Sequence, residues 1–269
     1  MPLQNLHTHS TFCDGKDTPH DIVKRAAELG MTAIGFSSHS FTEFDLSYCM
    51  KDEQKYISEC RSLRDEYAGV TDVFCGLELD YYSPIPAYDY DYVIGSVHYI
   101  NVGGDYIPVD ESPEILQAAA ERYFGGDMQK LCELYYETAA SVFKKTQCDI
   151  IGHFDLITKF CEQNPKLIDT ESMRYKHAVF SALDELIKSD SVFEVNTGAM
   201  ARGLRTLPYP SSECLKRIKE NGGRIILTSD CHAKEKLLFG FEEAKNALKE
   251  FGFKEQMYFD GKAFTFTAL

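Results

Sequence analysis

The chain has 269 residues, of which 44% are hydrophobic and 26% charged, a composition typical of soluble globular proteins. Its formal net charge of −14 makes nucleic acid a poor partner, because binding the nucleic-acid backbone needs clustered Lys and Arg. No apolar run approaches the roughly 18 residues of a membrane helix, and Met1-Pro2-Leu3 does not begin a signal peptide, so we expect a cytoplasmic protein with no membrane partner.

The nine cysteines are scattered along the chain, and none belongs to a C-x-x-C pair. Without a predicted signal peptide, free and buried thiols are expected rather than a disulfide framework. Cys13 and Cys231 adjoin candidate metal ligands, and we interpret both as packing residues.

Strand and helix patterns alternate along the chain. The first strand is expected over residues 3–9 and contains His7-Thr8-His9, after which Asp14-Gly15 lies in a loop. The first helix is expected over residues 18–29, where Thr18 can cap the helix and Pro19 suits its first turn. The strands that follow are expected over residues 31–37, 72–79, 92–97, 149–152, 191–195 and 224–228. The other helices are expected over residues 51–68, 127–145, 172–188, 211–220 and 236–251.

Two segments do not fit this alternation. Residues from about 100 to 126 are predicted to form an insertion with a Gly-Gly turn and a helix near residues 113–124. Residues 258–266 form a short last segment, which is expected to turn at Asp260-Gly261.

The alternation predicts an α/β fold with a parallel sheet and helices outside it. Seven principal strands in this length favour a closed barrel over an open doubly wound sheet. The first strand is also not followed by the G-x-G-x-x-G motif of a Rossmann fold. We therefore expect one barrel domain over residues 1–269, interrupted by the insertion at about 100–126.

Six of the eight histidines fall at the C-terminal ends of predicted strands. In a barrel these ends converge on one face, where barrel enzymes have their active sites. The polar residues expected there are His7, His9, Asp14, His39, Glu78, His98, His153, Asn196, Asp230 and His232. One histidine at a strand end is usually a packed residue, but six at one barrel mouth indicate a metal site. The other two, His20 and His177, fall inside predicted helices.

Six histidines and the carboxylates of Asp14, Glu78 and Asp230 make nine candidate ligands. Because one metal takes about four protein ligands or fewer, nine ligands indicate two or three metals, with Glu78 as a bridge. Sets rich in histidine suit Zn, Fe or Mn better than Mg. Such cations would also reverse the acidic charge locally for an anionic substrate.

Six short motifs occur together in the chain: His7-Thr8-His9-Ser10 with Asp14-Gly15, Ser38-His39-Ser40, Gly76-Leu77-Glu78, Gly95-Ser96-Val97-His98, Ile151-Gly152-His153 and Ser229-Asp230-Cys231-His232. In this order, and over nearly the whole chain, they resemble the PHP (polymerase and histidinol phosphatase) family. The resemblance implies a distorted (β/α)7 TIM-like barrel with three divalent metal ions at the C-terminal ends of its strands. It implies a first metal on His7, His9, Glu78 and Asp230, a second on Glu78, His98 and His153, and a third on Asp14, His39 and His232. The chain departs from the family at Ser37-Ser38-His39, which replaces a frequent Thr/Ser-Asp-His, so a carboxylate beside His39 is expected to be missing.

Further stretches are similar to the monofunctional histidinol-phosphate phosphatases of this family. They are residues 76–81, 93–99, 152–156 and 194–198, followed by Arg202, Arg205 and Pro208-Tyr209-Pro210. The similarity implies a metal-dependent phosphomonoesterase that hydrolyses L-histidinol phosphate to L-histidinol and phosphate, a step of histidine biosynthesis.

Hydrolysis of a phosphate ester suits a site of this kind. Adjacent metals lower the pKa of a shared water, and a hydroxide bridging the two metals joined by Glu78 would attack phosphorus in line with the leaving oxygen. Asp14 or Asp230 would pass a proton to the leaving alkoxide. Arg202 and Arg205 lie after the sixth strand and are candidates for binding the phosphate through paired hydrogen bonds, with Lys159 as a weaker candidate.

Three other functions are compatible with the sequence. One is a PHP-type phosphoesterase that acts on nucleotides or on another small phosphate ester. Another is an amidohydrolase-like barrel, although that class often has a carbamylated Lys where this chain has Glu78. The third is a metal-stabilised barrel that binds a partner without catalysis. The sequence gives no indication of the oligomeric state.

Overall fold

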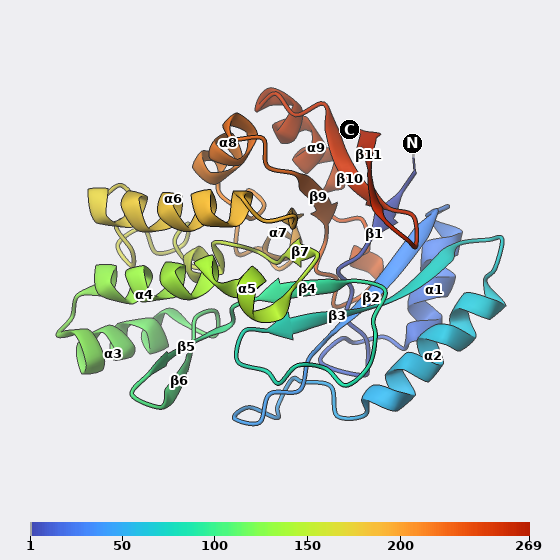
Figure 1. Cartoon of the computed structure of the whole chain (residues 1–269), viewed down its shortest axis with the longest axis horizontal. Helices are drawn as coiled ribbons and strands as arrows, with labels where there is room; N and C mark the ends of the chain where they lie inside the picture. Colours follow the sequence, from blue (N-terminus) through green and yellow to red (C-terminus); the bar gives the residue numbers. More distant parts are fainter. Residues whose placement is uncertain (1) are drawn as a thin grey trace.

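Seven parallel strands form the central sheet of the computed structural model, which describes residues 2–269 (Figure 1). In sheet order they are β1 Gln4–Asn5, β2 Ala33–His39, β3 Asp72–Asp80, β4 Val93–Ser96, β7 Ile150–Ile151, β8 Val192–Asn196 and β9 Ile225–Thr228. The first and last strands meet where Thr8 bridges Cys231 in parallel. The N–H of His9 donates to the carbonyl of Cys231 at 2.8 Å, and the N–H of Cys231 donates to the carbonyl of His7 at 3.0 Å. The predicted α/β barrel of seven parallel strands is therefore confirmed.

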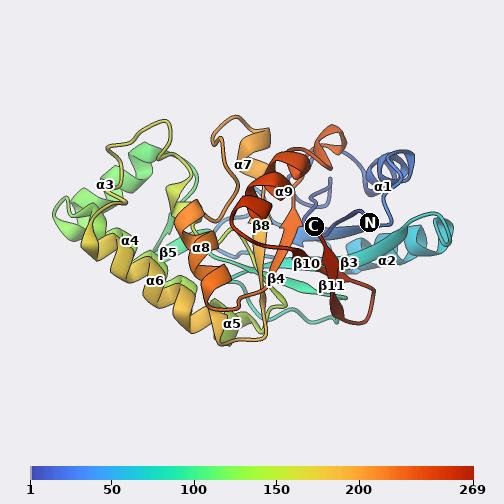
Figure 2. The same cartoon turned by 90° about the horizontal axis from the view of Figure 1, so that it is seen from above.

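Helices surround this sheet. They are α1 Pro19–Glu28, α2 Glu53–Glu66, α3 Pro113–Phe124, α4 Met128–Ala140, α5 Val142–Thr146, α6 Met173–Ile187, α7 Gly198–Ala201, α8 Ser212–Glu220 and α9 Phe241–Glu250. Figure 2 shows α1 and α2 at one end of the molecule and α3, α4 and α6 at the other. Helix α1 begins where predicted, because the Thr18 hydroxyl accepts the N–H of Asp21 at 3.2 Å and Pro19 occupies the first turn. Within residues 2–269, no helix is long and apolar enough to span a bilayer.

The first strand is shorter than predicted, because only Gln4–Asn5 of residues 3–9 belongs to the regular ladder with β2. Between β1 and β9, hydrogen bonds to the Asn5 side chain replace part of the backbone hydrogen bonding of a regular strand pair. Its Oδ1 accepts the N–H groups of His7 and Ser229, both at 3.2 Å. The chain beyond Asn5 still carries His7 and His9 into the barrel, where both are fully buried.

Two predicted helices have different limits. The helix expected over residues 127–145 is divided into α4 and α5 at Ser141, whose φ and ψ of −99° and 1° leave the helical range. The helix expected to start at residue 236 starts at Phe241, because Gly240 before it adopts a left-handed φ of 73°. Residues Lys234–Lys236 form a separate 3-10 turn, η2.

The segment predicted as an insertion contains a β-hairpin followed by α3. Strand β5 Tyr99–Val102 pairs antiparallel with β6 Asp105–Pro108 across Gly103-Gly104, whose positive φ values of 63° and 98° permit the tight turn. The ring of Tyr106 stacks on that of Phe44 with centroids 3.8 Å apart, so the hairpin packs against residues 41–50.

A second hairpin covers the N-terminal end of the barrel. It consists of β10 Glu255–Phe259 and β11 Phe264–Ala268. Met257 and Phe259 pack among buried side chains from the beginnings of the barrel strands. The Gln4 amide accepts the N–H of Phe259 at 3.0 Å and donates to its carbonyl at 2.8 Å. With this end covered, the C-terminal ends of the strands form the accessible face of the barrel.

Tyr92 fills the interior above this hairpin and is 1% exposed, and its hydroxyl lies 2.5 Å from the carbonyl oxygen of Leu6 and 2.9 Å from that of Phe36. We predict that Tyr92→Phe lowers the free energy of unfolding by roughly 1–3 kcal/mol, because the hydrogen bond from the hydroxyl to a buried carbonyl is lost. Urea denaturation measures this change. The control is Tyr88→Phe, whose side chain is 45% exposed and which should stay within about 0.5 kcal/mol of the wild type. A Tyr92→Phe variant as stable as the wild type would contradict this role of the hydroxyl.

Candidate metal centre

Glu78 lies at the centre of a cluster of imidazoles near the C-terminal end of β3. Its side chain is 1% exposed, and its Oε1 accepts a hydrogen bond from the Ser96 hydroxyl at 2.7 Å. Nitrogen atoms of five histidines lie within 3.5 Å of its carboxylate oxygens: His7, His9 and His39 at Oε2, and His98 and His153 at Oε1. A carboxylate with different imidazoles at its two oxygens is suited to bridge two metal ions.

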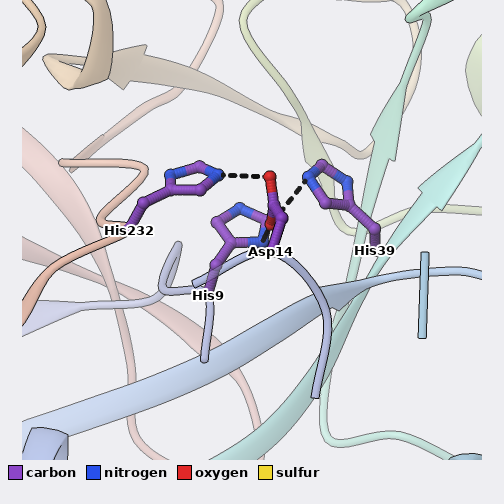
Figure 3. A group of neighbouring side chains, drawn as sticks. All are labelled: His9, Asp14, His39 and His232. Atoms are coloured by element: carbon purple, nitrogen blue, oxygen red, sulfur yellow. Dashed lines mark ion pairs between the residues drawn. The ribbon is translucent and has the colours of Figure 1, made fainter. Parts of the chain in front are cut away.

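A second group surrounds Asp14, in the loop after the first strand (Figure 3). His232 Nε2 lies 3.2 Å from Oδ2 of Asp14, and His39 Nε2 and His9 Nδ1 lie 3.6 Å and 3.8 Å from Oδ1. The Asp14 side chain is 34% exposed, so this group lies nearer to solvent than Glu78 does.

Asp230, after the end of β9, lies beside His7 and His9. Its Oδ1 lies 3.3 Å from His9 Nε2 and 3.7 Å from His7 Nε2. Asp230 has a φ of 46°, a left-handed conformation that is costly for a residue other than glycine and that is concentrated at functional sites. Gly198 allows this placement, because a side chain at that position would collide with the Asp230 carboxylate.

The structure brings all nine predicted ligands into one continuous cluster. Each group of three or four possible donors shares a member with another group, and together the groups contain every one of the nine. Asn196, the tenth strand-end residue, instead accepts the N–H of Gly198 at 2.8 Å and donates to Glu194 at 3.0 Å.

Several donor atoms of the cluster are buried without hydrogen bonds. Within residues 2–269, His7 Nε2, His9 Nε2 and Glu78 Oε2 have no hydrogen-bond partner. Unsatisfied buried polar atoms are costly, and divalent cations would satisfy them. Imidazole nitrogen and carboxylate oxygen form the donor set of Zn, Fe and Mn, so the residues fit such ions.

The pKa values of the clustered side chains are shifted in both directions. Burial, together with the nearby His232 and His39, lowers the pKa of His9 to about 3, so this imidazole is neutral at pH 7. Burial raises the pKa of Glu78, but the surrounding histidines, His7 first, outweigh it and hold that pKa well below its usual value. Burial lowers the pKa of His7, but the carboxylates around it outweigh this effect and hold that pKa well above its ordinary value. His9 and Glu78 are therefore already in the forms that bind metals, whereas His7 releases a proton when a metal binds.

Two carboxylates that support the cluster were missed from the sequence. Glu194 of β8 is 1% exposed, and its Oε1 lies 2.5 Å from His7 Nδ1, while its Oε2 accepts the N–H of His153 at 2.7 Å. Asp80 accepts the N–H of His98 at 3.1 Å, and the same oxygen lies 3.4 Å from His98 Nδ1. Carboxylates of this kind orient metal-binding histidines. The sequence contained a signal for Glu194, because it lies two residues before Asn196 and residues two apart in a strand point to the same face.

A cavity of about 560 Å³ opens over the cluster and is lined by Asp14, Glu78 and Asp230 together with Arg202 and Lys159. Arg202 Nη2 lies 3.1 Å from Oδ2 of Asp230, and its Nη1 lies 3.4 Å from His232 Nδ1. Lys159 faces the cavity but is paired with Asp110, Nζ to Oδ2 at 2.9 Å.

Arg205 is placed differently from Arg202 and does not belong to the cavity lining. Its Nη1 donates to the Thr158 hydroxyl at 2.7 Å, and its guanidinium lies 4.3 Å from the centre of the Tyr209 ring. Of the two predicted arginines, the structure therefore brings only Arg202 beside the ligand cluster.

We predict that Glu194→Gln weakens metal binding roughly 10- to 100-fold, because an amide holds His7 and His153 less well than a carboxylate does. Competition with a chromophoric chelator measures this affinity. Glu220→Gln, an exposed carboxylate at the end of α8, is the matched control and should not change it. Unchanged affinity in Glu194→Gln would mean that Glu194 only fills space.

Comparison with known proteins places this geometry in a family. The model of the PHP domain matches residues 5–198. A probable histidinol-phosphatase from Deinococcus radiodurans is 28% identical, over 93% of this chain and 94% of its own length. A probable histidinol-phosphatase from Schizosaccharomyces pombe is 26% identical, over 94% and 87%.

A solved structure shares the fold. It is the histidinol phosphate phosphatase of Lactococcus lactis, in complex with zinc, L-histidinol and phosphate. It is 21% identical, covers 98% of both chains and superposes with a TM-score of 0.73. With the matching family model extending over most of the barrel, the chain belongs to the PHP domain family.

Proposed function

We propose that this protein is a metal-dependent histidinol-phosphatase, which hydrolyses L-histidinol phosphate to L-histidinol and phosphate. The observation that carries the proposal is the guanidinium of Arg202, which lies 3.1 Å from Asp230 in a cavity whose floor is a cluster of metal-binding side chains. A fixed cation beside metal sites suits a dianionic phosphoryl group. The names of the relatives from Deinococcus and Schizosaccharomyces support the same substrate.

Three divalent ions, Zn, Fe or Mn, form the metal complement of this proposal. His7, His9, Glu78 and Asp230 would hold one ion, Glu78, His98 and His153 another, and Asp14, His39 and His232 the third. When bound, the ions lower the pKa of water and neutralise charge on the phosphoryl oxygens.

The side chains around the cavity have separate tasks in the reaction. Arg202 binds a non-bridging oxygen of the phosphate and orients the ester. Asp14, Glu78 and Asp230 all face the cavity. Either Asp14 or Asp230 passes a proton to the leaving alkoxide. Lys159 stays a weaker phosphate ligand, because Asp110 occupies its ammonium group. Arg205 contacts Thr158 and Tyr209 outside the cavity lining, and we assign it a structural role.

The proposal also includes one domain over residues 1–269 and a cytoplasmic location. The packing of the β10–β11 hairpin under the barrel supports a single unit. All nine cysteines are free thiols, which suits a reducing compartment.

We predict that Arg202→Ala costs roughly 2–4 kcal/mol of transition-state stabilisation, measured as kcat/KM for L-histidinol phosphate with metals retained. Arg202→Lys should recover part of this loss, because it keeps the charge without the guanidinium fork. Arg205→Ala should lower the melting temperature, and its kcat/KM should stay closer to the wild-type value than that of Arg202→Ala. If both alanine variants kept wild-type activity and metal content, the phosphate would have to bind elsewhere, with Lys159 as the next candidate.

Metal removal provides an independent prediction. Elemental analysis should find more than one transition metal per chain, and a chelator should abolish activity and lower the melting temperature, because ions that bind only the folded state stabilise it.

Glu78→Ala should be the most damaging carboxylate change, since it loosens two ions together. His177→Asn, on the exposed face of α6, should change neither metal content nor kcat by more than a few-fold. A maximum of one metal per chain after reconstitution would exclude a three-metal centre.

A further inference from the structure

The cavity has a second wall that the phosphate chemistry does not use. Residues 41–50 and the β5–β6 hairpin form it, and Asp45, Ser47, Tyr48 and Tyr99 line the cavity there. The metal cluster and Arg202 line another part of the same cavity. A substrate held by its phosphate at the metals would have its remaining groups in the cavity that this wall also borders.

The position of Asp45 is fixed by the packing of the segment that carries it. The Tyr99 hydroxyl donates to Oδ2 of Asp45 at 2.7 Å, and the Thr42 hydroxyl donates to the Asp45 carbonyl at 2.6 Å. The ring of the neighbouring Phe44 stacks on Tyr106 and meets the edge of Tyr99 with centroids 4.8 Å apart. A carboxylate held in this way is preorganised, which lowers the entropic cost of binding a ligand.

Among residues 2–269, no cationic side chain compensates the charge of Asp45. Its hydrogen bonds come from neutral groups, the Tyr99 hydroxyl and the hydroxyl and N–H of Ser47, at 2.7, 2.6 and 2.9 Å. Burial raises the pKa of Asp45, but these bonds outweigh it and hold that pKa below its ordinary value. Asp110, on the same side of the cavity, is neutralised by Lys159 at 2.9 Å. Within residues 2–269, no Lys, Arg or His forms an ion pair with Asp45.

Tyr48 connects this wall to the metal cluster. Its ring meets His39 edge-on with centroids 4.8 Å apart and lies 6.3 Å from the ring of Tyr99. Its hydroxyl is buried in the cavity lining and has no hydrogen-bond partner in the part of the chain that the structure describes. A continuous series of contacts, through Tyr48 and Tyr99, therefore connects the histidine cluster to the carboxylate of Asp45.

We propose that Asp45 is a specificity-determining residue, whose carboxylate binds the primary ammonium group of a small phosphate monoester while Tyr48 and Tyr99 flank the ligand. This inference rests on the proposed function, since L-histidinol phosphate carries an ammonium group close to its phosphate ester. The cavity then recognises opposite charges in two places, anionic phosphate at the metals and Arg202, and ammonium at Asp45.

The test compares two esters in the metal-loaded enzyme. Asp45→Asn should raise KM for L-histidinol phosphate roughly 10- to 100-fold, the loss expected for a hydrogen bond to a charged group, and change kcat by less than about 3-fold. For phenyl phosphate, which has no ammonium group, kcat/KM should change by less than about 2-fold. Inhibition by L-histidinol should weaken in the same variant, and inhibition by inorganic phosphate should not change.

Two matched variants complete the experiment. Glu43→Gln removes an exposed carboxylate from the same segment, outside the cavity lining, and should affect neither ester. Glu111→Gln removes the other unpaired carboxylate of the lining, at the exposed rim. A loss specific to L-histidinol phosphate in Glu111→Gln but not in Asp45→Asn would overturn the assignment. Equal losses for both esters in Asp45→Asn, or no loss at all, would also overturn it.

Failure of the proposed function gives a different result. A wild-type enzyme that hydrolyses phenyl phosphate but not L-histidinol phosphate would contradict the substrate and leave the ammonium site to be tested with O-phosphoethanolamine. A KM effect of Asp45→Asn on that ester alone would then support the site, and its absence would refute it. A metal-loaded enzyme inactive towards all three esters would overturn both proposals.

Discussion

The burial of the Glu78 carboxylate among imidazoles is the interaction on which the rest of the barrel depends. An ionised carboxylate in a protein interior costs several kcal/mol unless opposite charges or hydrogen bonds compensate it. Glu78 meets this condition through the hydroxyl of Ser96 and through histidines carried by the ends of several strands. These groups are far apart in sequence, so they compensate Glu78 only when the barrel closes. The same closure assembles the metal-binding cluster, and formation of the site is therefore tied to formation of the fold.

The two ends of the barrel have opposite character. At the N-terminal end, Tyr92 and the side chains of the β10–β11 hairpin form an apolar plug. At the C-terminal end, the interior is filled by histidines and carboxylates whose donor atoms need cations as partners. The apolar plug supplies packing that the polar end cannot provide, and the polar end supplies the chemistry. This division explains why a protein of this size can leave several buried polar atoms without hydrogen bonds.

The distribution of charge in the cavity is the basis of both proposals about the substrate. The chain has a formal net charge of −14, so an anionic ester is attracted only by local cations. Bound metals and Arg202 would provide them at the floor of the cavity. The carboxylate of Asp45, which no cation of the described chain neutralises, adds negative charge at another part of the cavity lining. Under the two proposals the cavity is divided by charge, and this division would orient a substrate that carries both signs.

Sequence patterns predicted the barrel because strand and helix periodicity is local and its alternation permits few topologies. The element limits were less certain where side chains replace backbone bonds, as Asn5 does at the first strand, or where one residue such as Gly240 changes the direction of the chain. The clustering of the nine candidate ligands could be predicted because they follow strand ends, and parallel strands bring their ends together in any barrel.

Tertiary structure alone decided how the remaining side chains are used. Arg202 and Arg205 share one loop, yet only Arg202 reaches Asp230, because Arg205 is bound to Thr158 and packed on Tyr209. Glu194 lies in an otherwise ordinary strand, and its role depends on His7, which is 187 residues away in the sequence. The sequence by itself determined which residues could meet at the strand ends, because local periodicity places them there. Which charged groups face the cavity, and which neutralise one another, was decided by contacts between distant segments, which no local pattern encodes.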